Sequence, residues 1–244
     1  MRGAQLAALA LAVVALTGCE TTQEKAAQLR RQEKRLAVSQ QGLSITRASS
    51  DVVVLGAAIV HDPERAAAVV TLHNRSASTL RAVPIAITVK DAGGRTLFQN
   101  DAPGLEGALV SVSSIPAHGT VVWVDDQLPA GTPASGTPAS VSATVGEGAS
   151  VSGAPPALGV SGAHVTEDPA NGVVATGTVA NHTRLQQSSL VVFAVARRSG
   201  KVVAAGRAIV SELAPGASAP FQASLVGRAS GARLEVFAPP ASLG

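Results

Sequence analysis

The chain has 244 residues, of which 46% are hydrophobic but only 2% aromatic, and its formal net charge at pH 7 is +3. Its one cysteine excludes a disulfide within the chain. Residues 42–244 hold 13 basic and 13 acidic residues. A neutral body lacks the electrostatic footprint of a nucleic-acid-binding protein, so a nucleic acid is not an expected partner.

The first eighteen residues have the three parts of a secretory signal. A charged Met1-Arg2-Gly3 start precedes an apolar stretch from Ala4 to Leu16, and small residues follow. The apolar stretch has about thirteen residues, whereas a helix that spans a bilayer needs about 20. Residues 1–18 are therefore predicted to be a signal peptide and not a membrane anchor.

The sequence Leu16-Thr17-Gly18-Cys19 at the end of this segment resembles the lipobox of bacterial lipoproteins. The resemblance implies that the signal peptidase recognises Leu16, Thr17 and Gly18, that the Cys19 thiol receives a diacylglyceryl group, and that the new amino terminus is acylated, with palmitate among the chains. Two or three acyl chains anchor a protein stably. The expected location is the cell envelope, on the outer face of the plasma membrane or on an outer membrane. An ordinary signal peptide with an incidental cysteine, or a buried helix, is the alternative.

Residues 20–41 contain neither glycine nor proline and consist mainly of good helix formers. Their apolar stripe is thin, which favours a solvated, partly helical tether over a coiled coil. We place the lipidated N-terminus and tether at residues 19–46. Five basic residues face three acidic ones in 20–41; beside anionic headgroups each basic residue contributes about 1 kcal/mol, although a solvated helix face explains them equally well.

After Gly42 the sequence consists of short apolar runs separated by Gly, Pro, Asn and Asp, a pattern that predicts strands. The first set of strands is expected at 52–60, 68–73, 83–90, 109–114, 120–124 and 141–145. Residues 129–139 and 146–156 are loop or linker by composition. The second set is expected at 159–165, 173–180, 190–196, 202–210, 219–226 and 233–237. We place the domains at 47–149 and 158–240, joined by a linker at 150–157.

The two sets of strands follow the same order, which indicates duplication of one module. In each set a strand runs up to an asparagine-led turn, at Asn74 and at Asn181, and a later apolar run turns on glycine, at 93–95 and at 199–201. A module of this length with six or seven short strands fits an immunoglobulin-like sandwich. The predicted fold is all-β, with two tandem immunoglobulin-like β-sandwich domains after the signal peptide and tether. Ile85, Ile87 and Val89 are expected on its core face.

The order of strands and turns resembles the FxLYD type of small β-sandwich found in bacterial envelope lipoproteins. Ile87, Val89 and Asp91 occupy the first, third and fifth places of the name motif, with Lys90 in place of Tyr. In the second module Phe193 and Val195 fit, but Arg197 replaces Asp. The resemblance implies an envelope location and interaction roles, and it brings no catalytic residues.

Chemistry-bearing residues form no pattern that announces an active site. The five histidines lack metal-ligand spacing and are expected in turns or on the surface, at positions 61, 73, 118, 164 and 182. Asp125-Asp126 and Glu167-Asp168 are expected to be solvated turn residues. No hydrolase elbow or phosphate-binding glycine pattern occurs. We therefore predict no cofactor, no metal site and no catalytic residue.

Two local motifs have simpler explanations than a functional one. Asn74-Arg75-Ser76 and Asn181-His182-Thr183 match the glycan acceptor pattern, but turn chemistry explains an asparagine at both places. Trp123, the sole tryptophan, is expected in a core, and the alternative is an exposed ligand platform.

The sequence thus predicts a non-enzymatic, lipid-anchored protein of structural or protein-interaction type with an envelope protein partner. The alternative is an envelope module that binds a small molecule or a glycan, which exposed aromatics at loop ends would favour.

Overall fold

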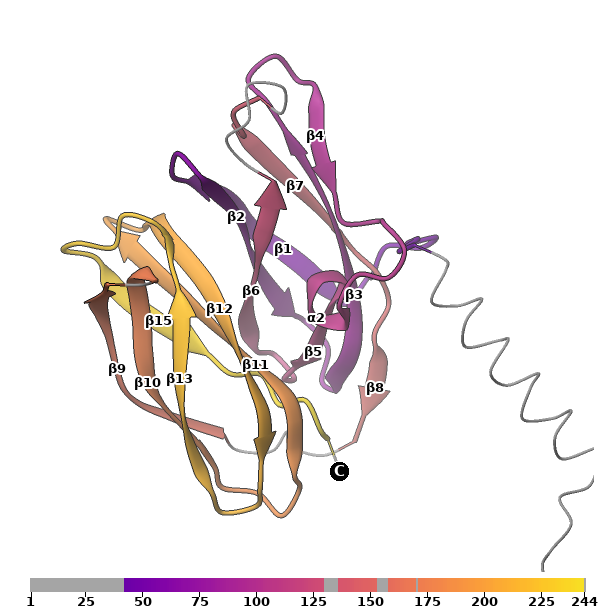
Figure 1. Cartoon of the computed structure of the whole chain (residues 1–244). Helices are drawn as coiled ribbons and strands as arrows, with labels where there is room; N and C mark the ends of the chain where they lie inside the picture. The colour runs from indigo at the N-terminus through magenta and orange to yellow at the C-terminus, as the bar shows by residue number, and fades with distance from the viewer. Residues whose placement is uncertain (1–41, 130–135, 153–157, 170, 244) are drawn as a thin grey trace, which may run out of the picture. The chain divides into compact units, whose positions relative to one another are not determined.

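The computed structural model describes residues 42–129, 136–152, 158–169 and 171–243 (Figure 1). The chain divides into two compact units, Met1–Gln40 and Gln41–Gly244, and all described strands belong to the second. The predicted signal peptide and the tether residues 20–41 lie outside the described residues. None of the helices in the described ranges has the length and apolarity that a membrane crossing requires.

The elements described between residues 52 and 237 are antiparallel strands apart from one short helix, so the all-β prediction is confirmed. We call β1–β8 the N-terminal half and β9–β15 the C-terminal half. The N-terminal half comprises β1 (Val52–His61), β2 (Arg65–Asn74), β3 (Thr79–Lys90), β4 (Thr96–Gln99), α2 (Gly107–Val110), β5 (Ser111–Ile115), β6 (Thr120–Pro129), β7 (Ser140–Val145) and β8 (Ala149–Val151). The C-terminal half comprises β9 (Leu158–Asp168), β10 (Gly172–Asn181), β11 (Gln187–Arg198), β12 (Lys201–Leu213), β13 (Ser218–Ser224), β14 (Val226–Gly227) and β15 (Arg233–Phe237).

Each half consists of a three-stranded sheet and a larger sheet. In the N-terminal half the order β1-β2-β6 forms one sheet, and β3 is the centre of the other, with β4, β5, β7 and β8 paired to it. In the C-terminal half the orders are β13-β10-β9 and β14-β12-β11-β15. No hydrogen-bonded strand pair among the described residues joins one half to the other.

Strand β3 serves different neighbours along its two halves. Residues 79–84 pair with β5 and β8, whereas residues 85–90 pair with β7 and partly with β4. Ala82 has φ = 48° in the first stretch, a conformation rare for a residue with a Cβ. After it the predicted alternation is confirmed, because Ile85, Ile87 and Val89 are buried and Lys90 is exposed.

Two strands depart from this alternation, because residues on both of their faces are buried. Residues 66–70 of β2 and 190–196 of β11 are buried without a break. Successive side chains of a strand point to opposite faces, so both faces of these strands are covered. The covering element is the other half, since β12 contacts β1, β2 and β6.

One hydrophobic cluster accordingly extends through both halves. It joins the interior of the N-terminal half to Val191, Phe193, Val195, Ala205 and Val226 of the C-terminal half. Two smaller clusters lie within the C-terminal half. Trp123 is 0% exposed within the shared cluster and its Nε1 donates to the Ala108 carbonyl at 2.8 Å, which confirms the predicted core position.

The structure differs from the sequence-based strand positions in several places; the run expected at 219–226, for example, divides into β13 and β14. Residues 109–110, expected to begin a strand, end the short helix α2, and the strand begins at Ser111. Strand β4 was not predicted, because its four residues are too few to show a pattern. Strand β8 lies in a segment expected to be loop; it is short but pairs along Thr79–Arg81.

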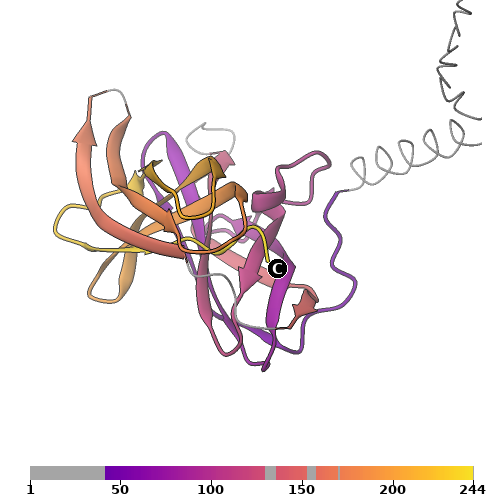
Figure 2. The ribbon, with the colours of Figure 1, turned by 90° about the horizontal axis from the view of Figure 1, so that it is seen from below.

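The segment that follows β15 lies between the two halves in both views (Figures 1 and 2). The hydroxyls of Ser113 and Ser114 on β5 donate to the carbonyls of Pro239 and Pro240, at 3.2 and 3.0 Å. On the other side, Gln187 Oε1 accepts the main-chain N–H groups of residues 241 and 242, each at 2.9 Å. The C-terminal segment thus connects β5 to the start of β11.

Candidate functional site

The four residues predicted for lipidation and cleavage, Leu16, Thr17, Gly18 and Cys19, lie outside the described residues. The candidate site therefore lies in the second compact unit.

The two asparagines of the glycan-acceptor patterns are completely buried, each inside the same hydrogen-bond network. Asn74 Oδ1 accepts the main-chain N–H and the hydroxyl of Ser76, at 2.9 and 2.8 Å. Asn181 Oδ1 accepts the same two groups of Thr183, at 3.1 and 2.7 Å. The Nδ2 groups donate to three carbonyls each: Ser78, Ile115 and Pro116 for Asn74, and Leu185, Leu213 and Ala214 for Asn181. Both motifs are therefore turn-forming networks, as turn chemistry predicts.

The histidines are spread over the surface, as the sequence predicts. Those at positions 61, 118, 164 and 182 are exposed, and His73 is half-buried with its Nδ1 3.1 Å from the Thr120 hydroxyl. Across the described ranges, no group of three or more His, Cys, Asp or Glu side chains is placed to hold a metal ion.

The prediction that Asp125 and Asp126 are solvated turn residues is wrong. Both lie on β6, where Asp125 is 1% exposed and the Asp126 side chain 17%. Asp126 accepts from the main-chain N–H and from Nε of Arg207 on β12, at 3.1 and 3.0 Å. Arg207 also donates through Nη2 to Glu106 at 3.0 Å. The aspartates are buried because the C-terminal half covers this end of β6.

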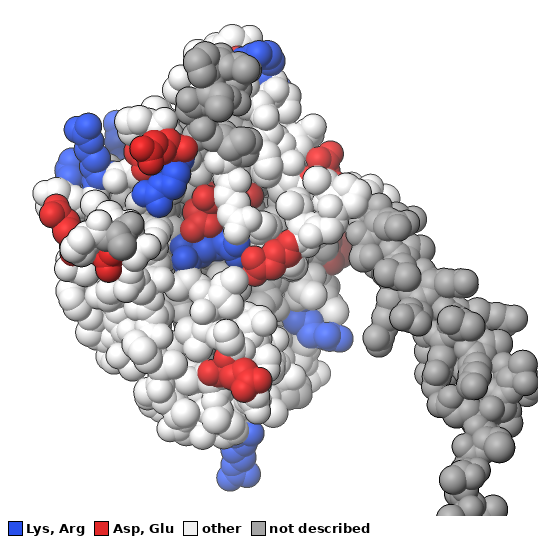
Figure 3. Space-filling view, in the orientation of Figure 1, with Lys and Arg blue, Asp and Glu red and all other residues white. Residues whose placement is uncertain are grey.

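The Arg207–Asp126–Glu106 cluster links the two halves by ion pairs, because Arg207 belongs to the C-terminal half and both carboxylates to the N-terminal half. The Arg207 side chain is 5% exposed and its Nη1 has no hydrogen-bond partner. Burial lowers the pKa of Arg207, but the Glu106 hydrogen bond and the charge of Asp126 outweigh it, and the net pKa is raised. On the visible face basic and acidic side chains are intermixed and form no patch of one sign (Figure 3).

Asp125, beside this cluster, lies in surroundings that favour its neutral form. Burial, with a smaller contribution from the adjacent Asp126 charge, raises its pKa to about 6, against the lowering effects of the Gln127 N–H bond and of Arg207. The charged form is the less favoured one because few groups replace its hydration.

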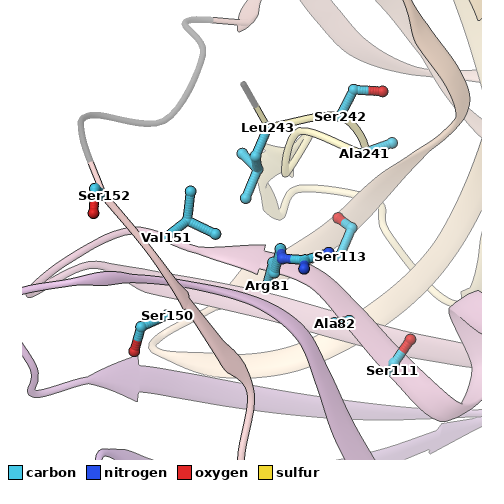
Figure 4. Close-up of a pocket in the computed structure, with 10 residues that line it drawn as sticks. All are labelled: Arg81, Ala82, Ser111, Ser113, Ser150, Val151, Ser152, Ala241, Ser242 and Leu243. Carbon is cyan, nitrogen blue, oxygen red and sulfur yellow. The ribbon is translucent and has the colours of Figure 1, made fainter.

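An open groove of about 790 Å³ lies at the end of the N-terminal half, between β3, β5, β8 and the C-terminal segment (Figure 4). It is lined by one cation, five hydroxyls and four apolar side chains: Arg81, Ser111, Ser113, Ser150, Ser152, Ser242, Ala82, Val151, Ala241 and Leu243. This arrangement has the chemistry to bind and orient a negatively charged, hydrogen-bonding group. Its described lining contains no nucleophile–base pair.

The groove and the charged cluster were both missed by sequence reasoning. Arg81 and Arg207 are single basic residues inside apolar runs, and only the fold places serines beside the first and carboxylates beside the second. One signal was present: residues 66–70 and 190–196 lack polar alternation, which indicates strands covered on both faces.

Comparison of the chain with models of known protein families gives no match, and comparison with curated proteins gives none either.

Proposed function

We propose that the chain is a lipid-anchored, extracytoplasmic protein of structural or protein-interaction type, located in a bacterial cell envelope. The observation that carries the proposal is the Leu16-Thr17-Gly18-Cys19 sequence directly after a short apolar stretch with a charged start. Acylated Cys19 would hold the protein to the membrane surface without a spanning helix. In this proposal the two halves are tandem immunoglobulin-like modules that arose by duplication, which the repeated Asn74 and Asn181 networks support.

The surface of the strand-rich unit supports an interaction role. Among the described strands, β1 and β9 each pair with one neighbour only, so the other edge of each offers main-chain groups to a partner. Leu55 on β1 is 59% exposed at an irregularity in the pairing. An exposed edge beside an exposed apolar side chain is the type of surface that protein partners use.

The aromatic residues favour this role over glycan binding. Trp123, Phe193 and Phe221 are buried, and Phe98 and Phe237 are half-buried, and the chain contains no others. The observation that keeps small-molecule binding as the second candidate is the open groove around Arg81.

The anchor is tested by replacing Cys19 with alanine in the full-length chain. The Cys19→Ala chain is expected to lose labelling by an alkyne analogue of palmitate and to leave the membrane fraction. Thr22→Ala, three residues after the lipidation site, is the matched control and is expected to keep both. Retention of the Cys19→Ala chain in the membrane fraction contradicts the proposal.

The interaction role is tested in intact cells by a photo-crosslinking amino acid at position 55. A discrete adduct with one envelope protein is expected in the lipidated chain. Its loss in the Cys19→Ala background shows that anchoring places the protein beside its partner. A diffuse pattern that is the same with and without Cys19 contradicts the interaction role.

A further inference from the structure

Arg81 lies in the groove without a charged partner. It is exposed, and no carboxylate among the described residues lies within 4.0 Å of its guanidinium. Other exposed arginines, such as Arg184, share this property, and it is the position in the groove that distinguishes Arg81. Neither acidic nor aromatic residues occur among the described residues that line the groove. The neighbouring Ala82 has a positive φ, and non-glycine residues in that region cluster at ligand-binding sites.

Some of the serine hydroxyls around Arg81 already donate a hydrogen bond within the protein, and others do not. Ser111 already donates to the Gly107 carbonyl and Ser113 to that of Pro239. Ser150, Ser152 and Ser242 make no side-chain hydrogen bond within the described part of the chain, so their hydroxyls remain available to a ligand or to water. A guanidinium with additional hydroxyl donors is suited to an oxyanion, which Arg binds in a bidentate manner.

We propose that this groove binds an extended peptide through a carboxylate, which pairs with Arg81. The peptide is favoured because the groove runs across the face of β5, β3 and β8 and combines the guanidinium with serine hydroxyls, which can bond to peptide main-chain groups, and with apolar side chains. Val151 and Leu243 supply the apolar contacts (Figure 4). A volume of about 790 Å³ suits an organic ligand better than a free inorganic anion. This inference rests on the proposed interaction role and names the partner chemistry.

The carboxylate could come from a peptide C-terminus or from an acidic side chain, and three synthetic peptides separate the sources. They are N-acetyl tetra-alanine with a free C-terminus, the same peptide as its amide, and an amidated peptide with one aspartate. Each is titrated into the mature lipidated chain, ¹⁵N-labelled and held in detergent micelles, while backbone amide shifts are recorded. Shifts on β3, β5 and β8 are expected at millimolar peptide. Binding of the free acid alone assigns a C-terminus; binding of both acidic peptides assigns any carboxylate.

The residue is tested with Arg81→Gln, matched by Arg184→Gln, which removes the charge of an exposed arginine in the C-terminal half. Arg81→Gln is expected to weaken binding of the carboxylate peptide about tenfold, to the level of the fully amidated peptide, and Arg184→Gln to leave it unchanged. Arg81→Lys keeps the positive charge but lacks the planar guanidinium that donates two parallel hydrogen bonds to a carboxylate. Its affinity for the carboxylate peptide is expected to lie between those of the other two variants, which also checks that substitution at this position leaves the fold intact.

The proposal is overturned if N-acetyl tetra-alanine amide, which has no carboxylate, binds as tightly as the two peptides that have one. Binding that Arg81→Gln does not change also overturns it, as does the lack of shifts at the groove at tens of millimolar peptide. These outcomes leave the anchor untouched, because the Cys19→Ala fractionation and the crosslinking at position 55 use neither Arg81 nor the peptides. Failure of the groove and failure of the anchored interaction role are therefore distinguishable.

Discussion

Asp125 is a carboxyl group in a site that favours its neutral form. It is 1% exposed, its Oδ1 accepts the Gln127 N–H at 3.0 Å, and the charge of Asp126 adjoins it. Arg207 stabilises the negative charge of Asp126 directly, because its Nε and its main-chain N–H both donate to that carboxylate. It makes no hydrogen bond to Asp125 and lowers the pKa of that group only by the attraction between the charges. A carboxyl group whose pKa is raised in the folded state opposes folding when it is ionised.

The raised pKa predicts that stability falls as pH increases from about 4 to 6.5. Below the unfolded-state value of 3.8 Asp125 is protonated in both states and costs nothing. Above the folded value of about 6 the full cost is present, about 3 kcal/mol for a shift of roughly two units. Asp125→Asn is expected to remove this dependence, measured by urea unfolding across the range. Asp51→Asn, at an exposed carboxylate, is the control; an unchanged slope in Asp125→Asn contradicts the assignment.

The buried asparagine networks predict a large effect from a small side chain. Asn74→Ala removes the Nδ2 donor of three carbonyls, of which only that of Ser78 keeps another side-chain donor, the Ser76 hydroxyl, and it removes the acceptor of the Ser76 N–H, in a site that is 0% exposed. A loss of about 3 kcal/mol in unfolding free energy is expected. Asn171→Ala, at an exposed asparagine that bonds to Asp168, is expected to change stability by less than half of that. Comparable losses in the two variants would show that the network is replaced by water.

At the scale of elements, the sequence predicts strands well where one face meets solvent and less well elsewhere. The alternation at Ile85–Val89 predicts both the strand and its core face. The uninterrupted run at 190–196 predicts a strand but does not say what covers its second face, because both faces are apolar. Strand β8 has no pattern of its own and exists because β3 offers it an edge.

The left-handed residue in β3 predicts a stabilising substitution. Ala82 is exposed and has φ = 48°, where a Cβ is disfavoured and glycine is not. Ala82→Gly is expected to raise the unfolding free energy by about 1 kcal/mol. Ala86→Gly, four residues along in regular strand, is expected to lower it by a similar amount. Thermal denaturation of the two variants gives the sign directly, and destabilisation by Ala82→Gly contradicts the strained geometry.

At the scale of the whole molecule, the relation between the halves could not be predicted from the sequence. Local turn chemistry repeats in the two halves, at Asn74 and at Asn181, and the sequence shows this repetition. The mutual packing of the halves depends on contacts between residues about 80 to 130 positions apart, such as Arg207 with Asp126 and Ser113 with Pro239. The groove is equally non-local, since it combines Arg81 with residues at the C-terminus.

The shared core and the buried charges predict that residues 42–244 unfold in one transition. Separating the halves would expose Val191, Phe193 and Val195 and leave the Arg207–Asp126 pair in water, so neither half is expected to persist alone. The calorimetric and van't Hoff enthalpies of the mature chain are expected to agree. Arg207→Ala leaves the Asp126 charge without its partner and is expected to cost about 3–5 kcal/mol, whereas Arg184→Ala costs little. Two separate transitions, of which Arg207→Ala shifts only one, would show that the halves fold independently and that the contact between them is weak.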